Sequence, residues 1–139
     1  MNRRASILSF LALTAAPVAL LAASESVASA QAAAADWLRK IDGSKYAASW
    51  QTAAEMFKAA ISAEAWEQAV QSVRGPLGAM RHRTETSATY TKSLPGVPDG
   101  LYVVIQFKSV FAKKTDVIEK VTVAQDKDGV WRVAGYFVR

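Results

Sequence analysis

The stretch of sequence that decides the fold is Leu101-Tyr102-Val103-Val104-Ile105-Gln106-Phe107-Lys108-Ser109-Val110-Phe111. Apolar side chains recur at alternate positions in it, namely at Leu101, Val103, Ile105, Phe107 and Phe111. Successive side chains of an extended chain point to opposite faces, so a period of two places this set on one face of a β-strand. The stretch therefore predicts a strand with one face turned to the core.

Three more strands are predicted around this one. Residues 80–91, 116–125 and 130–138 are rich in Thr, Val and aromatic residues and share the same period. The segments 94–100 and 126–129 between strands contain the Pro, Gly and Asp residues that favour tight turns. Because strands joined in this way pair antiparallel, we expect one four-stranded antiparallel sheet.

The chain before Gly78 has a helical period instead. Apolar residues at intervals of three and four predict helices over residues 32–41 and 44–61, and Ser62 is placed to cap a third helix over residues 63–74. Helices first and a meander of strands afterwards indicate an α+β domain. We expect the N-terminal helices to pack on one face of a curved four-stranded sheet.

The N-terminus has the pattern of a cleavable secretory signal. Met1-Asn2-Arg3-Arg4 is a short basic start, and residues 5–23 carry no charge. The small residues Ala28-Ser29-Ala30 suit a signal peptidase, so we expect residues 1–30 to be removed and residues 31–139 to form a single domain. An uncleaved, membrane-bound N-terminus is the alternative. The expected destination is export, to the periplasm, with no membrane span left after cleavage.

Composition excludes several classes of function. The chain has no cysteine, which removes disulfides, thiolate metal sites and a cysteine nucleophile. Loss of Arg3, Arg4 and Glu25 with the signal leaves a net charge of about +4, against +5 for the whole chain. The basic residues are interspersed with acidic ones, so nothing points to a nucleic-acid partner. No phosphate-binding glycine motif is present, and we expect no cofactor.

The chain resembles an exported bacterial family known as domain of unknown function 4019. The motifs that carry the resemblance are Tyr46-Ala47-Ala48-Ser49-Trp50, Val73-Arg74-Gly75-Pro76-Leu77-Gly78, Leu94-Pro95-Gly96-Val97-Pro98-Asp99-Gly100-Leu101-Tyr102 and Gly129-Val130-Trp131-Arg132-Val133-Ala134-Gly135-Tyr136-Phe137. The last of these is also similar to the final strand of nuclear transport factor two-like proteins. That similarity implies a cone-like sheet, of the nuclear transport factor two-like or cystatin-like kind, and it leaves function open because such domains include isomerases, dehydratases and non-catalytic binding modules.

Glu119 is the candidate catalytic carboxylate. Alternation places it with Val117, Val121 and Val123 on an otherwise apolar face, where a carboxylate needs a partner. One hypothesis is an acid or base in a cavity, assisted by Tyr102 or Tyr136. The other, which we favour, is a structural ion pair with Arg83, Arg132 or Lys108.

The second face of the sheet is the candidate interaction surface. Alternation assigns Trp131, Val133, Gly135 and Phe137 to the core face of the last strand, with Gly135 as a bend. The opposite face then carries a largely apolar set made of Tyr102, Val104, Val110, Tyr136 and Val138. The solvent-exposed face of an antiparallel sheet is normally more polar than this set. We therefore expect a homodimer or a protein partner to cover this face.

The remaining candidates favour structural roles. His82 is the only histidine and has no further metal ligands nearby in sequence, so we expect a surface or strand-edge histidine and no metal site. Trp37, Trp50, Trp66 and Trp131 fall on core-facing positions.

The sequence therefore predicts an exported, non-catalytic interaction or small-ligand-binding module. Its candidate binding residues are Arg83, Tyr102, Glu119, Arg132 and Tyr136. The alternative is a small-molecule isomerase or hydrolase of the cone-shaped superfamily that uses Glu119.

Overall fold

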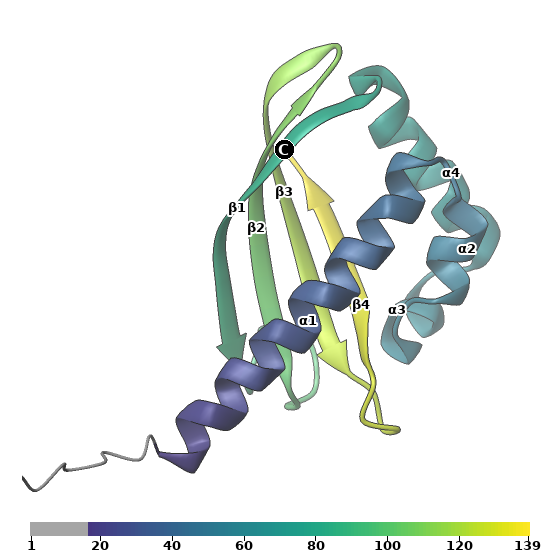
Figure 1. Cartoon of the computed structure of the whole chain (residues 1–139). Coiled ribbons are helices and arrows are strands. Elements are labelled where there is room, and N and C mark those ends of the chain that lie inside the picture. Colours follow the sequence, from purple (N-terminus) through teal and green to yellow (C-terminus); the bar gives the residue numbers. More distant parts are fainter. Residues whose placement is uncertain (1–16) are drawn as a thin grey trace, which may run out of the picture.

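The computed structural model describes residues 17–139 as helices followed by an antiparallel sheet (Figure 1). The helices are α1 (Val18–Asp42), α2 (Tyr46–Gln51), α3 (Glu55–Ala60) and α4 (Ala63–Arg74), and a 3₁₀ turn, η1 (Gly75–Leu77), follows them. The strands are β1 (Met80–Thr91), β2 (Tyr102–Phe111), β3 (Lys114–Gln125) and β4 (Trp131–Val138). The α+β prediction is confirmed, and the four strands lie within two residues of their predicted bounds.

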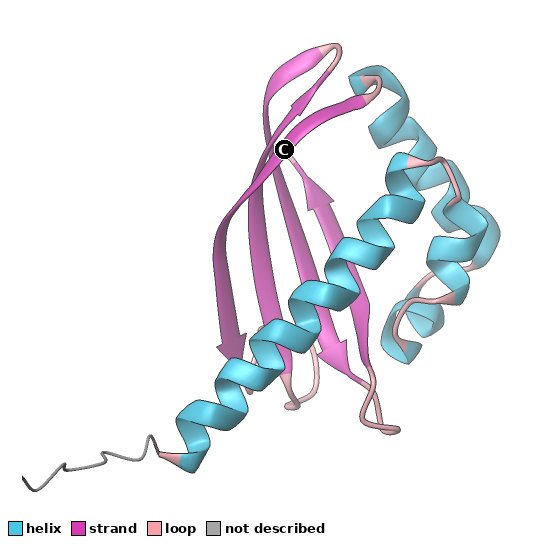
Figure 2. Ribbon diagram, in the orientation of Figure 1, coloured by secondary structure: helices cyan, strands magenta, loops and turns pink. Residues whose placement is uncertain are grey.

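The sheet is open, with the strands in the order β1-β2-β3-β4 and every neighbouring pair antiparallel. Helix α1 lies across one face of it and contacts all four strands (Figure 2). The shorter helices lie beyond α1 on the β4 side, where α2 packs on α4 and α3 contacts β4. We call the face under α1 the inner face and the opposite one the outer face. The cone-like curvature expected from the resemblance stays a prediction.

Helix α1 has a buried half and an exposed half. The buried residues are Ala30, Ala34, Trp37, Leu38 and Ile41, which recur at helical spacing. In contrast, Val18, Leu20 and Leu21 are exposed, and this end of the helix projects past the sheet (Figure 1). Length and composition would allow α1 to cross a membrane, but a signal sequence near the N-terminus has the same properties. The part of the predicted signal before residue 17 lies outside the described residues.

The prediction of one continuous helix over residues 44–61 is wrong. The structure has two short helices there, because the chain is extended at Ala54 and the backbone N–H of Ala54 donates to the carbonyl oxygen of Val133 at 2.8 Å. Ala53 and Ala54 are fully buried at this contact with β4. The apolar period survives the break because Trp50 and Phe57 both pack toward the same core.

Helix α4 begins as predicted. The Ser62 hydroxyl accepts a hydrogen bond from the backbone N–H of Ala65 at 3.2 Å, which satisfies one of the free donors at the helix start. Trp66 and Val70 form its buried side. Its last residue, Arg74, is also buried, so the end of α4 brings a guanidinium into the interior.

A β-bulge in β4 reverses the predicted orientation of that strand's second half. Thr122 pairs with Gly135 and Val123 pairs with Val133, so Ala134 is an extra residue. Trp131 and Val133 face the inner side as expected. After the bulge, Tyr136 and Val138 pack against the core on the inner side, whereas Gly135 and Phe137 face outward. The prediction that Gly135 and Phe137 face the core, with Tyr136 and Val138 on the outer face, is therefore wrong.

Candidate functional site

Glu119 lies in the middle of β3 on the inner face and is completely buried. Its Oε1 atom accepts hydrogen bonds from Arg83 Nε at 2.7 Å and from the Ser109 hydroxyl at 2.5 Å. Its Oε2 atom accepts from Arg83 Nη2 at 3.1 Å and from the Tyr136 hydroxyl. Of the three basic partners expected from the sequence, Arg83 is the one that forms the ion pair.

A second carboxylate, Asp42, completes this cluster from the last residue of α1. Asp42 accepts from Arg83 Nη1 and Nη2 at 2.8 and 2.9 Å, and from Arg74 Nη2 at 2.9 Å. Arg74 also stacks over the Phe111 ring, 4.6 Å from its centroid, and its Nη1 lies 3.5 Å from the Tyr136 hydroxyl. Helix α1, helix α4 and all four strands thus meet at one group of side chains.

We call Asp42, Arg74, Arg83, Ser109, Glu119 and Tyr136 the buried polar cluster. It contains two guanidinium groups and two carboxylates, so its formal charges balance when both acids are ionised. Burial acts to raise the pKa of Asp42, but the hydrogen bonds and charges of Arg83 and then Arg74 outweigh burial and hold that pKa below its usual 3.8. Burial raises the pKa of the Tyr136 phenol, and the Glu119 carboxylate raises it further, so the phenol stays protonated and donates to Glu119.

The cluster leaves Glu119 no free position for a ligand. Four donor atoms from Arg83, Ser109 and Tyr136 occupy its two oxygens. Glu119 is absent from the lining of five hollows on the surface of residues 17–139. A substrate could reach this carboxylate only if the cluster came apart.

The other candidate residues are dispersed. Tyr102 does lie on the outer face, but it is buried there because segment 94–98 covers it, and its hydroxyl donates to the carbonyl oxygen of Pro98. Arg132 pairs with Asp126 and Asp128 in the β3–β4 hairpin, at 2.9 Å in each case. The structure therefore brings Arg83, Glu119 and Tyr136 together but places Tyr102 and Arg132 elsewhere.

His82 and the tryptophans lie where their patterns indicate. His82 is exposed on the edge strand β1, with its Nε2 atom 2.9 Å from the Thr84 hydroxyl. Trp37 and Trp66 are buried, and their indole N–H groups donate to the Ser49 carbonyl oxygen and hydroxyl, both at 2.9 Å. Within residues 17–139, no group of three or more His, Asp or Glu side chains could hold a metal ion.

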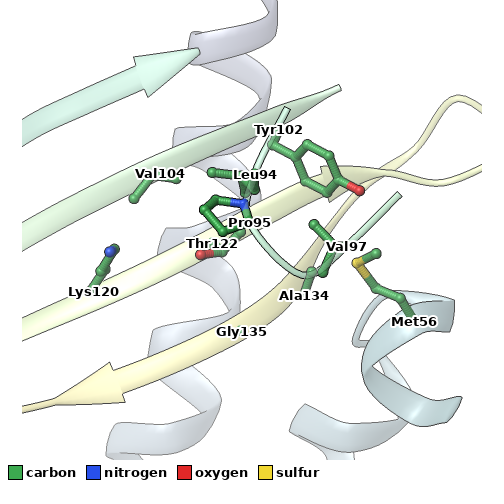
Figure 3. Close-up of a pocket in the computed structure, with 10 residues that line it drawn as sticks. All are labelled: Met56, Leu94, Pro95, Val97, Tyr102, Val104, Lys120, Thr122, Ala134 and Gly135. Atoms are coloured by element: carbon green, nitrogen blue, oxygen red, sulfur yellow. The ribbon is translucent and has the colours of Figure 1, made fainter. Parts of the chain in front are cut away.

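The outer face carries a surface depression that the sequence does not reveal. Its first part is a hollow of about 280 Å³ between segment 94–97, helix α3 and strands β2 to β4 (Figure 3). The residues that line it are Met56, Leu94, Pro95, Val97, Tyr102, Val104, Lys120, Thr122, Ala134 and Gly135. A second hollow of about 460 Å³ shares Lys120, Thr122 and Gly135 with the first and extends to Phe137, which is 59% exposed.

We call these two connected hollows the outer trough. Gly135 forms part of its floor, where a Cβ atom would meet only Thr122, at 3.6 Å or more. The glycine therefore leaves space that most strand residues would fill. Lys120 is the one charged residue among those that line either hollow. Figure 3 places Lys120 toward one end of the first hollow and Met56 at the opposite end.

Sequence reasoning missed Asp42, Arg74 and Lys120. Asp42 and Arg74 appear in the sequence only as helix-ending residues, and nothing local shows that two helix ends converge on β1. The available signal for Arg74 was its position one turn after Val70 on the buried side of α4. Lys120 follows Glu119 on β3 and therefore faces the opposite side of the sheet. In the sequence, nothing distinguishes it from an ordinary solvent-exposed lysine.

The family described as "Protein of unknown function (DUF4019)" matches residues 33–136. No curated protein and no solved structure was found to match the chain, so the similarity to nuclear transport factor two-like proteins has no support from a solved structure. The match covers most of the chain, and the chain belongs to the DUF4019 family.

Proposed function

We propose that this member of the DUF4019 family is an exported, non-catalytic binding module that holds a small ligand in the outer trough. The observation that carries the proposal is the contrast between the two faces of the sheet. On the inner face, the carboxylate that catalysis would need is fully buried and saturated with hydrogen bonds. On the outer face, two connected hollows are open to solvent.

The composition of the trough supports binding of a small molecule. Ligand sites are concave, mostly apolar and supplied with a few polar groups, and they commonly occupy about 300 to 1,000 Å³. The outer trough has apolar walls from Leu94, Pro95, Val97 and Phe137, with Lys120 and Thr122 as polar groups. Its first hollow, at about 280 Å³, lies just below that range and suits a small ligand.

Export is supported by the N-terminal sequence and by the exposed first half of α1. Residues 18–22 are exposed in a helix that has an apolar stretch long enough to span a membrane, so the folded domain does not use them. A removable signal explains why such a segment is present. We propose the periplasm as the destination of the exported protein.

The first prediction tests the trough with a substitution that fills it. Gly135→Val projects a branched side chain into the floor, and the space around Gly135 accommodates a Cβ atom without displacement of backbone. We expect the variant to fold and to bind fragments at least tenfold more weakly. The measurement is the change in backbone amide NMR shifts while a library of small organic fragments is titrated into the protein, expressed with its own N-terminus and recovered in the form the cell produces.

The control is Thr84→Val, which places the same side chain on the exposed edge strand β1, away from the trough. It should leave binding unchanged. Fragments that shift the amides of Asp42 and Arg83 rather than those of Thr122 and Gly135 would place the site in the buried polar cluster and revive the isomerase or hydrolase hypothesis. Light scattering on the same samples detects the competing case, a homodimer or other protein partner that covers the outer face, because the trough would then be closed.

A further inference from the structure

The outer trough has an electrostatic polarity that its apolar walls alone would not give. Among the described residues, Lys120 has no carboxylate in ion-pair contact, and no acidic residue lines either hollow. The strand partners of Lys120 are Gln106 on β2 and Phe137 on β4, and neither neutralises it. Its ammonium group is therefore available to an anion.

The end of the first hollow opposite Lys120 is apolar. Met56 and Val97 line it, and Tyr102 presents only its ring because its hydroxyl is engaged by the Pro98 carbonyl oxygen. Figure 3 shows Lys120 and Thr122 on one side and Met56 on the other. A ligand that matches this arrangement has a negative group at one end and an apolar chain at the other.

We infer that the outer trough binds an amphipathic monoanion, namely an acyl chain of medium length with a terminal carboxylate held by Lys120. This inference rests on the proposed function and specifies its ligand class. The hollow of about 280 Å³ is too small for a large ring system, whereas a flexible chain can follow it from Lys120 to Met56. Thr122 offers its hydroxyl as a second donor next to Lys120.

The test uses three probes that share a ten-carbon chain and differ in their head group. Decanoate is anionic, decyl maltoside is neutral and decyltrimethylammonium is cationic, and all are used below their micelle concentrations. Acetate controls for the carboxylate alone. Titration calorimetry and amide NMR shifts on the protein as the cell produces it give the affinities and the site. We expect decanoate to bind tightest, at Thr122 and Gly135, and acetate not to bind measurably.

Lys120→Met retains the aliphatic stem and removes the charge. It should weaken decanoate binding roughly fivefold, the size expected for a solvent-accessible ion pair, and leave decyl maltoside binding unchanged. Added salt should weaken decanoate binding to the wild type and have little effect on the variant. The matched control is Lys114→Met, which removes the same charge about 20 Å away along β3, at a rise of about 3.3 Å per residue.

The outcomes separate this inference from the proposed function. Equal affinity for the three head groups, or no effect of Lys120→Met, overturns the carboxylate assignment while the trough stands as a binding site. Decanoate binding that Gly135→Val leaves intact overturns both. Binding of no ten-carbon probe overturns the acyl-chain inference, and the fragment titration then decides the proposed function by itself.

Discussion

Arg83 is the residue on which the interior of this domain depends. It comes from the edge strand β1, yet its guanidinium donates to Glu119 on β3 and to Asp42 on α1. Burial lowers the pKa of Arg83, but the hydrogen bonds and charges of Asp42 and Glu119 outweigh burial and raise it above its ordinary value. An arginine suits this position because its planar fork can serve two carboxylates at once.

The Glu119 carboxylate should be required for stability. Glu119→Leu leaves Arg83 with one partner and leaves the Ser109 and Tyr136 hydroxyls without an acceptor, so we expect it to destabilise the fold by about 3 to 5 kcal/mol. Glu119→Gln retains the volume and one acceptor oxygen and should cost about 1 to 3 kcal/mol. Urea unfolding followed by tryptophan fluorescence measures both. Glu85→Gln, on the exposed part of β1, is the control and should change stability by less than about 0.5 kcal/mol; a Glu119→Leu protein as stable as this control would show that the cluster is dispensable.

Asp42 should make the fold sensitive to acid. Its folded pKa is below its usual 3.8, so the stability it contributes is present above that value and is lost as the pH falls through the lower, folded pKa. Asp42→Asn lacks this contribution at every pH. We therefore expect the stability gap between wild type and variant to be large near neutral pH and to shrink as the pH falls below 3.8 and through the lower, folded pKa. Urea melts over that range test this, and a gap that is independent of pH would contradict it.

At the scale of elements, the sequence predicts each strand and helix better than it predicts where their side chains point. The period of two locates β4 correctly, but one extra residue at Ala134 exchanges the faces of Tyr136 and Phe137. A bulge is set by pairing with β3, and a single sequence carries no direct signal for it. This exchange brings Tyr136 into the buried polar cluster and removes it from the outer face.

In the helical region, too, a contact distant in sequence changes what the local pattern predicts. The apolar period from Tyr46 to Ile61 is continuous, yet the helix breaks where Ala54 bonds to Val133, a contact between residues far apart in the chain. The ion pair of Glu119 was predictable because a buried charge requires compensation. Its partners Asp42 and Arg74 were not, because their convergence depends on how two helices cross the sheet.

At the scale of the whole molecule, the domain lacks the large apolar outer patch predicted for it. The bulge turns Tyr136 and Val138 inward, and segment 94–98 covers Tyr102, so Val104, Val110 and Phe137 remain on that side. Less apolar surface is therefore left on this face to support a homodimer, and self-association stays a prediction. The outer trough lies on this same face, between segment 94–97, helix α3 and strands β2 to β4.

Processing of the N-terminus is the prediction at this scale. We expect the exported protein to begin at Gln31, and its intact mass to match residues 31–139 with Gln31 free or cyclised. Ala30→Arg should block cleavage and leave the longer chain associated with the membrane. Ala32→Arg, two residues beyond the cleavage site at an exposed position, is the control and should be processed normally. Recovery of the wild-type chain from the cytoplasm with its first residues intact would contradict export.

The burial of Ala30 requires that export and signal cleavage come before folding. In the folded chain the Ala30–Gln31 peptide bond lies inside α1, and Ala30 is fully buried against the sheet. The side-chain amide of Gln31 donates a hydrogen bond to the Glu85 carboxylate at 2.9 Å. Peptidases cut exposed, extended segments, so a chain that had already folded would hide this bond from the enzyme. A chain processed at this bond must therefore cross the membrane unfolded and be cut before α1 docks, and premature folding would trap it as an uncut precursor.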